Sequence, residues 1–332
     1  MNREKIVYLL KDQGLLSGSS VELKPLEGGV SSDIYLATDG RHKYVIKQAL
    51  QKLQVEDDWY ADISRNDIEQ DFIRYLGKYR PGAIPKLIYN NKEEHFYVME
   101  FLGKDFRNWK QEMLGGVFNR DTAVKAARLL ADIHLHSQDD DDLRQQFNNL
   151  ENFHSLRIEP YLITTGRRHP RLQSHFDEEA ERLQQHRQAL VHGDFSPKNI
   201  MVKGDRVVIL DHEVAWYGDP AFDAAFFLNH LYLKMLYHYT RQGEIVDLAT
   251  AAWDTYFSQL DKPLREGLEK RVGRLLLMMM LARVDGKSPV EYLEERQQKF
   301  IRDFVHHQLP GRVLFLSDIN ENWKSKMENT NI

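Results

Sequence analysis

The sequence of 332 residues contains no cysteine. This absence excludes disulfides, zinc sites built on thiolates, dithiol redox motifs and cysteine nucleophiles. Long apolar runs are also missing, because the longest, residues 275–282, is far shorter than the ~20 residues that a helix needs to cross a bilayer. Residues 1–14 lack the basic and then apolar pattern of a secretory signal. We therefore expect a cytoplasmic protein without a membrane partner.

The chain also lacks an excess of basic residues, since 45 Lys and Arg stand against 50 Asp and Glu, a net charge of −5. A mildly acidic protein has no electrostatic footprint for nucleic acid, so we expect no nucleic-acid partner. With only 19 glycines and 10 prolines, the sequence is not rich in linkers. Its length suits two modest domains or one large two-lobed unit, and it leaves the oligomeric state open.

The first third of the chain carries the signals of strands. Short segments rich in Val, Ile, Tyr and Phe, each bounded by turn residues, predict strands at 21–26, 34–38, 44–47 and 96–101. Asp39-Gly40, between two of these segments, is typical of a hairpin turn. One amphipathic helix is predicted over 66–79. Residues 1–103 are therefore expected to form a small sheet with one helix.

Helical periodicity dominates after Gly103. The pattern predicts helices over 120–136, over 176–188 and from Asp219 onward. One hairpin is expected in between, with strands at 200–202 and 207–210 joined by a turn that contains Gly204. The sequence thus predicts an α+β protein with a second, mainly helical domain over residues 104–332.

Three residues around the predicted hairpin carry the chemistry. Asp194 and Asn199 precede it, and Asp211 follows it. Because a hairpin returns the chain on itself, Asn199 and Asp211 can face one another across its open end. A carboxylate and an amide oxygen together are suited to Mg²⁺, which prefers few protein ligands plus substrate phosphates. Asp194 is then available to orient or deprotonate a nucleophile.

The same segment carries a family resemblance. His192-Gly193-Asp194, with Asn199 five residues after the Asp, resembles the H-G-D-x-x-x-x-N signature of the aminoglycoside phosphotransferase, choline kinase and methylthioribose kinase superfamily. That resemblance implies a two-lobed protein-kinase-like fold, with a small antiparallel-sheet N-lobe and a larger, mainly helical C-lobe. It also implies that Asp194 is the catalytic base and that Asn199 and Asp211 hold magnesium.

The residues after the metal segment extend the resemblance. Asp211-His212-Glu213 looks like the D-x-E pattern of methylthioribose kinases, which makes Glu213 a further candidate metal ligand. Asp219 before Pro220 is also a favourable helix start, whatever the function. We interpret Asp223 as a structural brace under the catalytic loop rather than as a catalytic group.

In the first third, the resemblance implies an ATP site. A turn with backbone N–H groups that can wrap phosphates contains the candidate nucleotide-binding residues Gly28, Gly29, Ser31 and Ser32. Lys47, on the next predicted strand, resembles the lysine of V-A-I-K, which contacts the phosphates. Glu69 of the predicted helix is its expected partner, with Asp71 as the competitor.

A hinge-like segment completes the predicted nucleotide site. Residues 98–103 resemble the family's V-M-E hinge, whose backbone reads the adenine edge, so Met99, Glu100 and Leu102 are candidate ATP-binding residues. The lysine, the glutamate, the hinge and the two catalytic motifs follow one another in the order of the family.

Three later residues are candidates for the acceptor site. Trp216 and Tyr217 directly follow the metal segment, where they would either wall the acceptor pocket or pack in the core. Arg283 has two interpretations. Methylthioribose kinases have an arginine pair near the transferred phosphate, so the resemblance allows Arg283 to contact the substrate. The alternative is a structural salt bridge, which needs only one arginine. His134 and His136 do not share a helix face, so a metal site there is not expected.

Together these motifs predict a cytoplasmic small-molecule kinase, dependent on ATP and Mg²⁺, that phosphorylates a hydroxyl of a sugar-like acceptor. An aminoglycoside or amino-alcohol (choline-type) phosphotransferase is the alternative within the enzymes. A nucleotide-binding pseudokinase with a regulatory partner is the alternative from another class. The intact set of Lys47, Asp194, Asn199 and Asp211 disfavours it.

Overall fold

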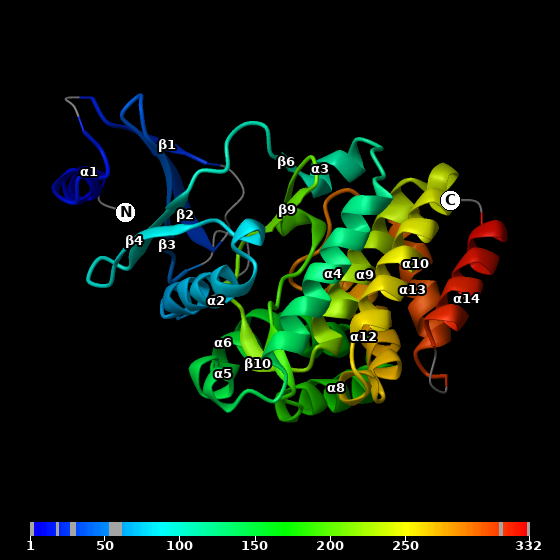
Figure 1. The fold of residues 1–332 in the computed structure, drawn as a ribbon. Coiled ribbons are helices and arrows are strands. Elements are labelled where there is room, and N and C mark those ends of the chain that lie inside the picture. The colour runs from blue at the N-terminus through cyan, green and yellow to red at the C-terminus, as the bar shows by residue number, and fades with distance from the viewer. Residues whose placement is uncertain (1–2, 18–19, 27–30, 53–61, 312–314, 331–332) are drawn as a thin grey trace. The chain divides into compact units, whose positions relative to one another are not determined.

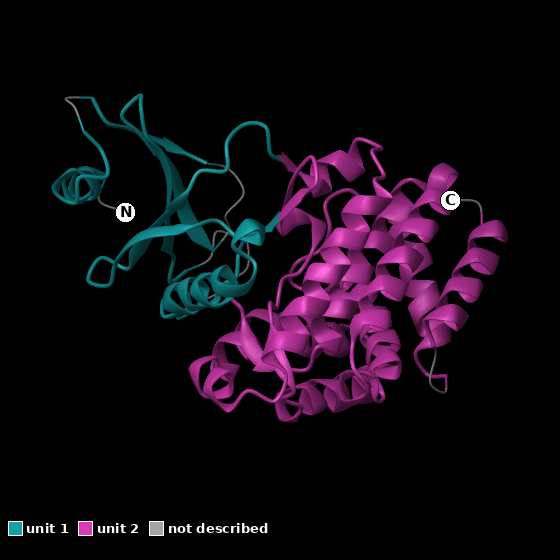
Figure 2. Cartoon of the chain, in the orientation of Figure 1, with its two compact units in different colours: residues 1–106, 208–213 teal, residues 107–207, 214–332 magenta. Residues whose placement is uncertain are grey.

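The computed structural model describes residues 3–17, 20–26, 31–52, 62–311 and 315–330. The chain forms two compact units: unit 1 contains residues 1–106 and 208–213, and unit 2 contains residues 107–207 and 214–332 (Figure 2). The predicted lobe boundary at Gly103 stays a prediction. Within the described ranges, every helix is too short or too polar to span a bilayer.

Unit 1 is built on a five-stranded antiparallel sheet with the strand order β1-β2-β3-β5-β4 (Figure 1). The strands are β1 (Glu22–Pro25), β2 (Ser32–Thr38), β3 (Lys43–Ala49), β4 (Leu87–Asn91) and β5 (Phe96–Glu100). Four of them lie where the sequence predicts strands. β4 was not predicted, since it ends in two asparagines, which disfavour strands.

Two helices accompany this sheet, α1 (Arg3–Asp12) and α2 (Arg65–Tyr79). The predicted helix over 66–79 is confirmed as α2. α1 was not predicted from its mixed sequence, and it buries Ile6 and Leu10 in one apolar cluster with Ile46 of β3 and Phe96 of β5. This cluster fixes the sheet that carries Lys47.

Unit 2 is mainly helical. Its helices are α3 (Trp109–Leu114), α4 (Arg120–Ser137), α5 (Asp141–Gln146), α6 (Leu150–Phe153), α7 (Thr164–Arg168), α8 (Gln173–Gln185), α9 (Ala221–Tyr237), α10 (Gln242–Gln259), α11 (Lys262–Arg265), α12 (Leu268–Asp285), α13 (Glu295–Gln308) and α14 (Leu316–Glu328). α10 packs on α4 and on α9, and α12 packs on α9 (Figure 1). Every residue of the apolar run 275–282 is buried in α12. The predicted α+β class is confirmed.

Short strands frame the loops of unit 2. They are β6 (Arg107–Asn108), β7 (Ala189–Val191), β8 (Ile200–Lys203), β9 (Arg206–Ile209) and β10 (Trp216–Gly218). Residues 208–209 of β9 are already part of unit 1. β8 and β9 confirm the predicted hairpin around Gly204. The helix predicted to reach residue 188 ends earlier, at Gln185, because the backbone N–H of Gln188 donates to Gly218 O at 2.8 Å next to the β7–β10 pair.

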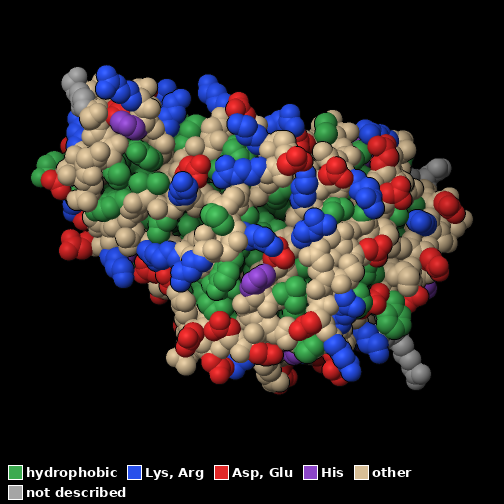
Figure 3. All heavy atoms as spheres, viewed as in Figure 1, with side chains coloured by type: hydrophobic (Ala, Val, Ile, Leu, Met, Phe, Trp, Pro, Cys, Tyr) green, Lys and Arg blue, Asp and Glu red, His purple; other side chains and the backbone are tan. Residues whose placement is uncertain are grey.

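A π-helical segment, η2 (His154–Ile163), joins α6 to α7. Pro160 lies inside it. Proline cannot donate the backbone hydrogen bond of an α-helix and its ring clashes with the carbonyl one turn before, so a wider local helix accommodates it. Charged side chains of both signs are interspersed on the face of the molecule in Figure 3, as the small net charge of −5 leads one to expect.

Candidate functional site

Lys47 is the centre of an ionic cluster in unit 1. It lies in the middle of β3 and is only 4% exposed. Its Nζ is 2.8 Å from Glu69 Oε2 and 2.6 Å from Asp211 Oδ1. Asp71, the competing partner in the sequence, instead pairs with Arg74 on the same helix at 2.7 Å. The structure therefore pairs Lys47 with the carboxylate favoured from the sequence.

Burial and charge oppose each other within this cluster. Burial lowers the pKa of Lys47, but the carboxylates of Asp211 and Glu69 outweigh it and hold the pKa well above its ordinary value. Burial raises the pKa of Glu69 to about 7, and the charge of Lys47 counters only part of this rise. The ammonium of Lys47 is therefore secured in its charged form by its acidic neighbours.

Glu213 is held by a residue that the sequence did not single out. Arg65, fully buried at the start of α2, donates from Nε to Glu213 Oε2 at 3.2 Å, and Ser32 Oγ donates to the same oxygen at 3.4 Å. Glu69, Asp211 and Glu213 each offer a carboxylate oxygen, and the three oxygens lie within 4.8 Å of one another. Asp211 itself has a left-handed backbone with φ of 67°.

Among the remaining nucleotide candidates of unit 1, Ser32 lies in β2 and Met99 and Glu100 lie in β5 of this sheet. Gly28 and Gly29 fall outside the described residues. The carbonyl of Ser31 accepts bonds from Leu50 N at 2.9 Å and from Arg65 Nη2 at 2.6 Å. In β5, Met99 pairs with Val45 and Glu100 with Tyr44. Leu102 follows β5 and precedes Gly103, whose φ is 87°.

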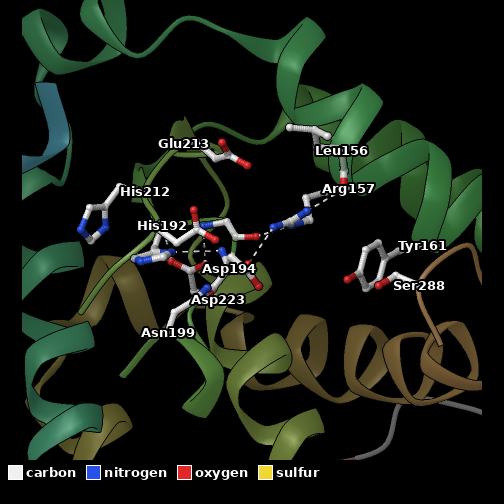
Figure 4. A network of polar contacts seen from close by, with 12 residues as sticks. Leu156, Arg157, Tyr161, His192, Asp194, Asn199, His212, Glu213, Asp223 and Ser288 are labelled. Atoms are coloured by element: carbon white, nitrogen blue, oxygen red, sulfur yellow. Dashed lines mark hydrogen bonds and ion pairs between the residues drawn. The ribbon is translucent and has the colours of Figure 1, made fainter. Parts of the chain in front are cut away.

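The loop of unit 2 that carries the predicted base Asp194 is braced by Asp223 of α9 (Figure 4). The carboxylate of Asp223 accepts the backbone N–H groups of His192 at 2.7 Å and of Gly193 at 2.9 Å. Asp223 therefore braces the loop, as the sequence predicts. Gly193 has φ of 77°, and a Cβ at this position would lie 2.7 Å from Val214 O. Only glycine fits here.

Asp194 is fixed by contacts on two sides. Its Oδ2 lies 3.3 Å from Nη2 of Arg157, whose guanidinium also donates to Gly193 O (Figure 4). Its carbonyl accepts the side-chain N–H of Asn199 at 3.0 Å. This bond turns the amide nitrogen of Asn199 toward the loop and leaves the oxygen to face other groups. Arg157 lies in η2, and no motif in the sequence pointed to it.

The three acceptor candidates have different surroundings. Trp216 is fully buried and stacks on Phe153 with 4.6 Å between ring centroids. The hydroxyl of Tyr217 is bonded to the carbonyls of Ser137 and Gln188. These contacts are those of core packing, the alternative that the sequence left open.

Arg283 is partly exposed at the end of α12. Its Nη1 donates to Tyr161 Oη at 3.1 Å and to Ser288 Oγ at 2.8 Å. Among the described residues no carboxylate pairs with it, so the salt bridge expected under the structural interpretation is not formed.

Residues 22–244 match the family model described as "Phosphotransferase enzyme family". The chain belongs to this family. Methylthioribose kinase of Geobacillus kaustophilus is 25% identical to the phosphotransferase over 290 residues, which are 78% of this chain and 72% of that protein. Choline kinase from Cryptosporidium parvum is a structural neighbour with a TM-score of 0.55 and 13% identity, covering 99% of this chain and 94% of that one. An ethanolamine kinase from Plasmodium vivax is a second structural neighbour, with a TM-score of 0.51 and 12% sequence identity. The match covers 99% of this chain and 89% of that one.

These relationships establish the predicted kinase-like fold and the class of enzyme. The phosphotransferase is a small-molecule kinase that uses ATP, similar to methylthioribose kinase in sequence. The structural neighbours below 25% identity support the fold alone.

The carboxylates of unit 1 also fit the magnesium that kinases require. Glu69, Asp211 and Glu213 supply hard oxygen donors, which are the ligands that Mg²⁺ prefers. Lys47 binds Glu69 and Asp211 in the structure. Asp211 and Glu213, the two carboxylates that the sequence predicts as metal ligands, belong to this donor set.

Proposed function

We propose that the phosphotransferase transfers the γ-phosphate of ATP to a hydroxyl of a sugar-like small molecule, with Asp194 as the base. The single observation that carries the proposal is the double ion pair of Lys47 with Glu69 and Asp211. A lysine secured in this way is suited to binding the phosphates of ATP. The sugar-like acceptor is supported by the relatives, which are named methylthioribose kinase.

In the proposed reaction, unit 1 supplies the nucleotide-binding groups. Ser31, Ser32 and Lys47 contact the phosphates, together with the glycines Gly28 and Gly29. The backbone around Met99, Glu100 and Leu102 binds the adenine. Asp211, Glu213 and Asn199 are the residues that would hold Mg²⁺, which would offset the negative charge of the phosphates.

Unit 2 supplies the acid–base chemistry. Asp194 accepts the proton of the acceptor hydroxyl while the hydroxyl oxygen forms a bond to the γ-phosphorus and the bond to the bridging oxygen of ADP breaks. Arg157 holds one oxygen of the Asp194 carboxylate at 3.3 Å, and Asp223 fixes the backbone of the loop. The carboxylate is thereby oriented before the acceptor arrives.

The substitution Asp194→Asn tests this role. We expect it to fold and to bind MgATP with little change, while kcat for acceptor phosphorylation falls about 10²–10⁴-fold, the usual contribution of a positioned general base. Asp205→Asn is the matched control, because Asp205 is fully exposed in the β8–β9 turn and pairs only with Lys125 there. Turnover within threefold of the wild type in Asp194→Asn would contradict the assignment.

A panel of neutral sugars, aminoglycosides and amino alcohols, assayed by acceptor-dependent ADP release, tests the reaction itself. A protein that binds MgATP but releases no ADP with any acceptor would be a pseudokinase.

A further inference from the structure

Unit 2 contains a group of basic side chains on the side of Arg157 away from Asp194. We call it the cationic cluster: Lys110 of α3, His230 and Lys234 of α9, and Arg283 of α12, together with the rings of Tyr161 and Tyr292. Neither the reaction proposed above nor the packing of the core explains why so many basic groups gather here.

The cluster begins one aromatic ring away from the catalytic loop. The guanidinium carbon of Arg157, which pairs with Asp194, lies 5.7 Å from the ring centroid of Tyr161 (Figure 4). The guanidinium carbon of Arg283 lies 5.9 Å from the same ring. Both arginines thus lie near the ring of Tyr161. Arg157 is paired with Asp194, whereas Arg283 forms no ion pair among the described residues and interacts electrostatically with Glu291. A chain of contacts from Asp194 through Arg157 and Tyr161 to Arg283 links the loop to the cluster.

The second half of the cluster surrounds Tyr292. The ammonium of Lys234 lies 5.2 Å and that of Lys110 lies 5.8 Å from the centroid of its ring. Lys234 is completely buried, and its Nζ donates at 3.3 Å to the carbonyl of His230 in its own helix. Lys110 has a partner in Glu291, but the side chain of Glu291 is 66% exposed.

The charges of the cluster are close enough to act on one another. Burial, and then the charges of Lys110 and Arg283, lower the pKa of Lys234 to about 7. Burial and the same neighbours, with Lys234 added, hold the pKa of His230 well below its ordinary value. Burial is the largest cause of both shifts, and the neighbouring positive charges act in the same direction. Glu291 counters them, since it raises the pKa of Lys234 and interacts with Lys110 and Arg283.

Two polar atoms of the cluster are buried without a hydrogen-bond partner, Nε of Arg283 and the hydroxyl of Tyr292. Buried donors are normally paired, and an unpaired donor is costly. Arg283, Tyr292 and Lys110 nevertheless remain partly exposed as residues. The cluster therefore combines several basic groups, two unsatisfied polar atoms and partial exposure to solvent.

We propose that the cationic cluster binds an oxyanion of the acceptor, so that the substrate is an acidic alcohol, a sugar-like molecule with a carboxylate or a phosphate. This inference rests on the proposed function and narrows its acceptor. Arg283 and Tyr292 donate to the oxyanion, and Lys110 and Lys234 balance its charge. Cationic acceptors such as amino alcohols are repelled by the same groups.

Acceptors that share a scaffold and differ in charge test the proposal. Glycerate is compared with glycerol and 3-amino-1,2-propanediol, gluconate with glucose and glucosamine, and ribose 5-phosphate with ribose. We expect an acidic acceptor to have the highest kcat/KM of its set. Comparison of the carboxylates glycerate and gluconate with ribose 5-phosphate shows whether the bound oxyanion is a carboxylate or a phosphate. A higher kcat/KM for a neutral or amino member would overturn the charge assignment and leave the kinase reaction intact.

Variants connect this preference to the cluster. Arg283→Met should lower kcat/KM for the best acidic acceptor on the order of 10- to 100-fold, since hydrogen bonds to charged groups contribute about 1.5–3 kcal/mol. Arg283→Lys should recover part of the loss, and KM for MgATP should change less than twofold. The matched control is Arg274→Met on the same helix, because Arg274 pairs with Glu178 outside the cluster. Equal losses in Arg283→Met and Arg274→Met would contradict the proposal.

Calorimetry without ATP separates acceptor binding from phosphoryl transfer. At pH 8, binding of gluconate, glycerate or ribose 5-phosphate to the wild type should be accompanied by proton uptake, measured in two buffers of different ionisation enthalpy, because an oxyanion favours the charged form of Lys234. Lys234→Met should remove this uptake. Failure of all three acids to bind would overturn the oxyanion assignment. Binding of an acid without ADP release from any acceptor would instead overturn the proposed function.

Discussion

At the scale of single residues, the charge state of a buried lysine depends on whether carboxylates lie beside it. Lys47 keeps its charge because Asp211 and Glu69 lie within 3 Å of its ammonium. Lys234 has no carboxylate partner among the described residues, and burial takes its pKa down to about 7. Two buried lysines of one protein thus shift in opposite directions, and the difference lies in the carboxylates around them.

The substitution Lys234→Met is expected to stabilise the protein near neutral pH. The pKa of Lys234 is about 7 in the folded protein and about 10.5 in the unfolded chain. Between these two pH values the unfolded chain binds more protons than the folded protein. The contribution of Lys234 to the free energy of unfolding therefore rises with pH in this range. At and below pH 7 its burial opposes folding. Lys110, Arg283, Glu291, His230 and Tyr292 surround it.

Urea denaturation of the wild type and of Lys234→Met from pH 6.5 to 10 measures this effect. We expect the free energy of unfolding to increase by about 1–4 kcal/mol at pH 7, as when other buried charges are replaced by apolar groups. The gain should shrink toward pH 10. A variant that is less stable than the wild type at every pH would contradict the depressed pKa.

At the scale of elements, a few backbone positions place the catalytic groups. Gly193 adopts a left-handed conformation under the carbonyl of Val214, and Asp223 at the start of α9 accepts the two neighbouring N–H groups. In η2, the proline-induced π-helix puts Arg157 and Tyr161 close to the same loop and cluster. The loop is shaped by segments that come from three parts of the chain.

Gly193→Ala and Gly204→Ala form a matched pair for this element. Both glycines have positive φ, 77° and 54°, so both alanines carry about 1–2 kcal/mol of backbone strain. Only at position 193 does the new Cβ meet an obstacle, Val214 O at 2.7 Å, whereas nothing lies within 4 Å at position 204.

We therefore expect Gly193→Ala to lose at least tenfold in kcat and to be the less stable of the two variants. Gly204→Ala should keep the turnover of the wild type. Steady-state kinetics and thermal unfolding compare them directly, and equal kcat values in both variants would show that the close approach to Val214 does not matter.

A helix or strand can be predicted from the sequence when its pattern is contained in a few neighbouring residues. The hairpin at Gly204 and the helix α2 were predicted, because a turn glycine and a helical period are contained in a few neighbouring residues. α1 and β4 were missed. α1 has a mixed sequence, and it buries Ile6 and Leu10 against strands far along the chain. β4 pairs with the neighbouring strand β5, but its two terminal asparagines give no strand signal.

At the scale of the whole molecule, a short segment late in the chain belongs to unit 1 rather than to unit 2. Residues 208–213 belong to unit 1, although residues 107–207 before them and 214–332 after them form unit 2. Asp211 and Glu213 join unit 1 through Lys47 and Arg65, which are buried basic residues of that unit. The ionic cluster thus attaches residues 208–213 to the sheet of unit 1.

Lys47→Met tests this attachment. Removal of one member of a buried ion pair leaves uncompensated carboxylates and typically costs 3–5 kcal/mol. We expect faster amide hydrogen exchange in residues 208–213 and in the described part of unit 1, with exchange in α9 and α12 unchanged. Lys270→Met is the control, since Lys270 belongs to unit 2. If residues 208–213 kept their protection while the rest of unit 1 lost it, the cluster would not be what attaches them.

The sequence by itself predicted the class of enzyme and the family. The motifs around Asp194, Asn199 and Asp211, with Lys47 and Glu69 before them, resemble those of small-molecule kinases, and the family model confirms this resemblance. Each motif is contained in a few neighbouring residues, so it can be found without the fold. The tertiary structure alone showed the charge pairs that no motif predicted. It brought Asp211 to Lys47, Arg65 to Glu213 and Arg157 to Asp194, and it gathered the cationic cluster. Such pairs join segments far apart in the chain, and the packing that brings them together leaves no periodic signal in the sequence.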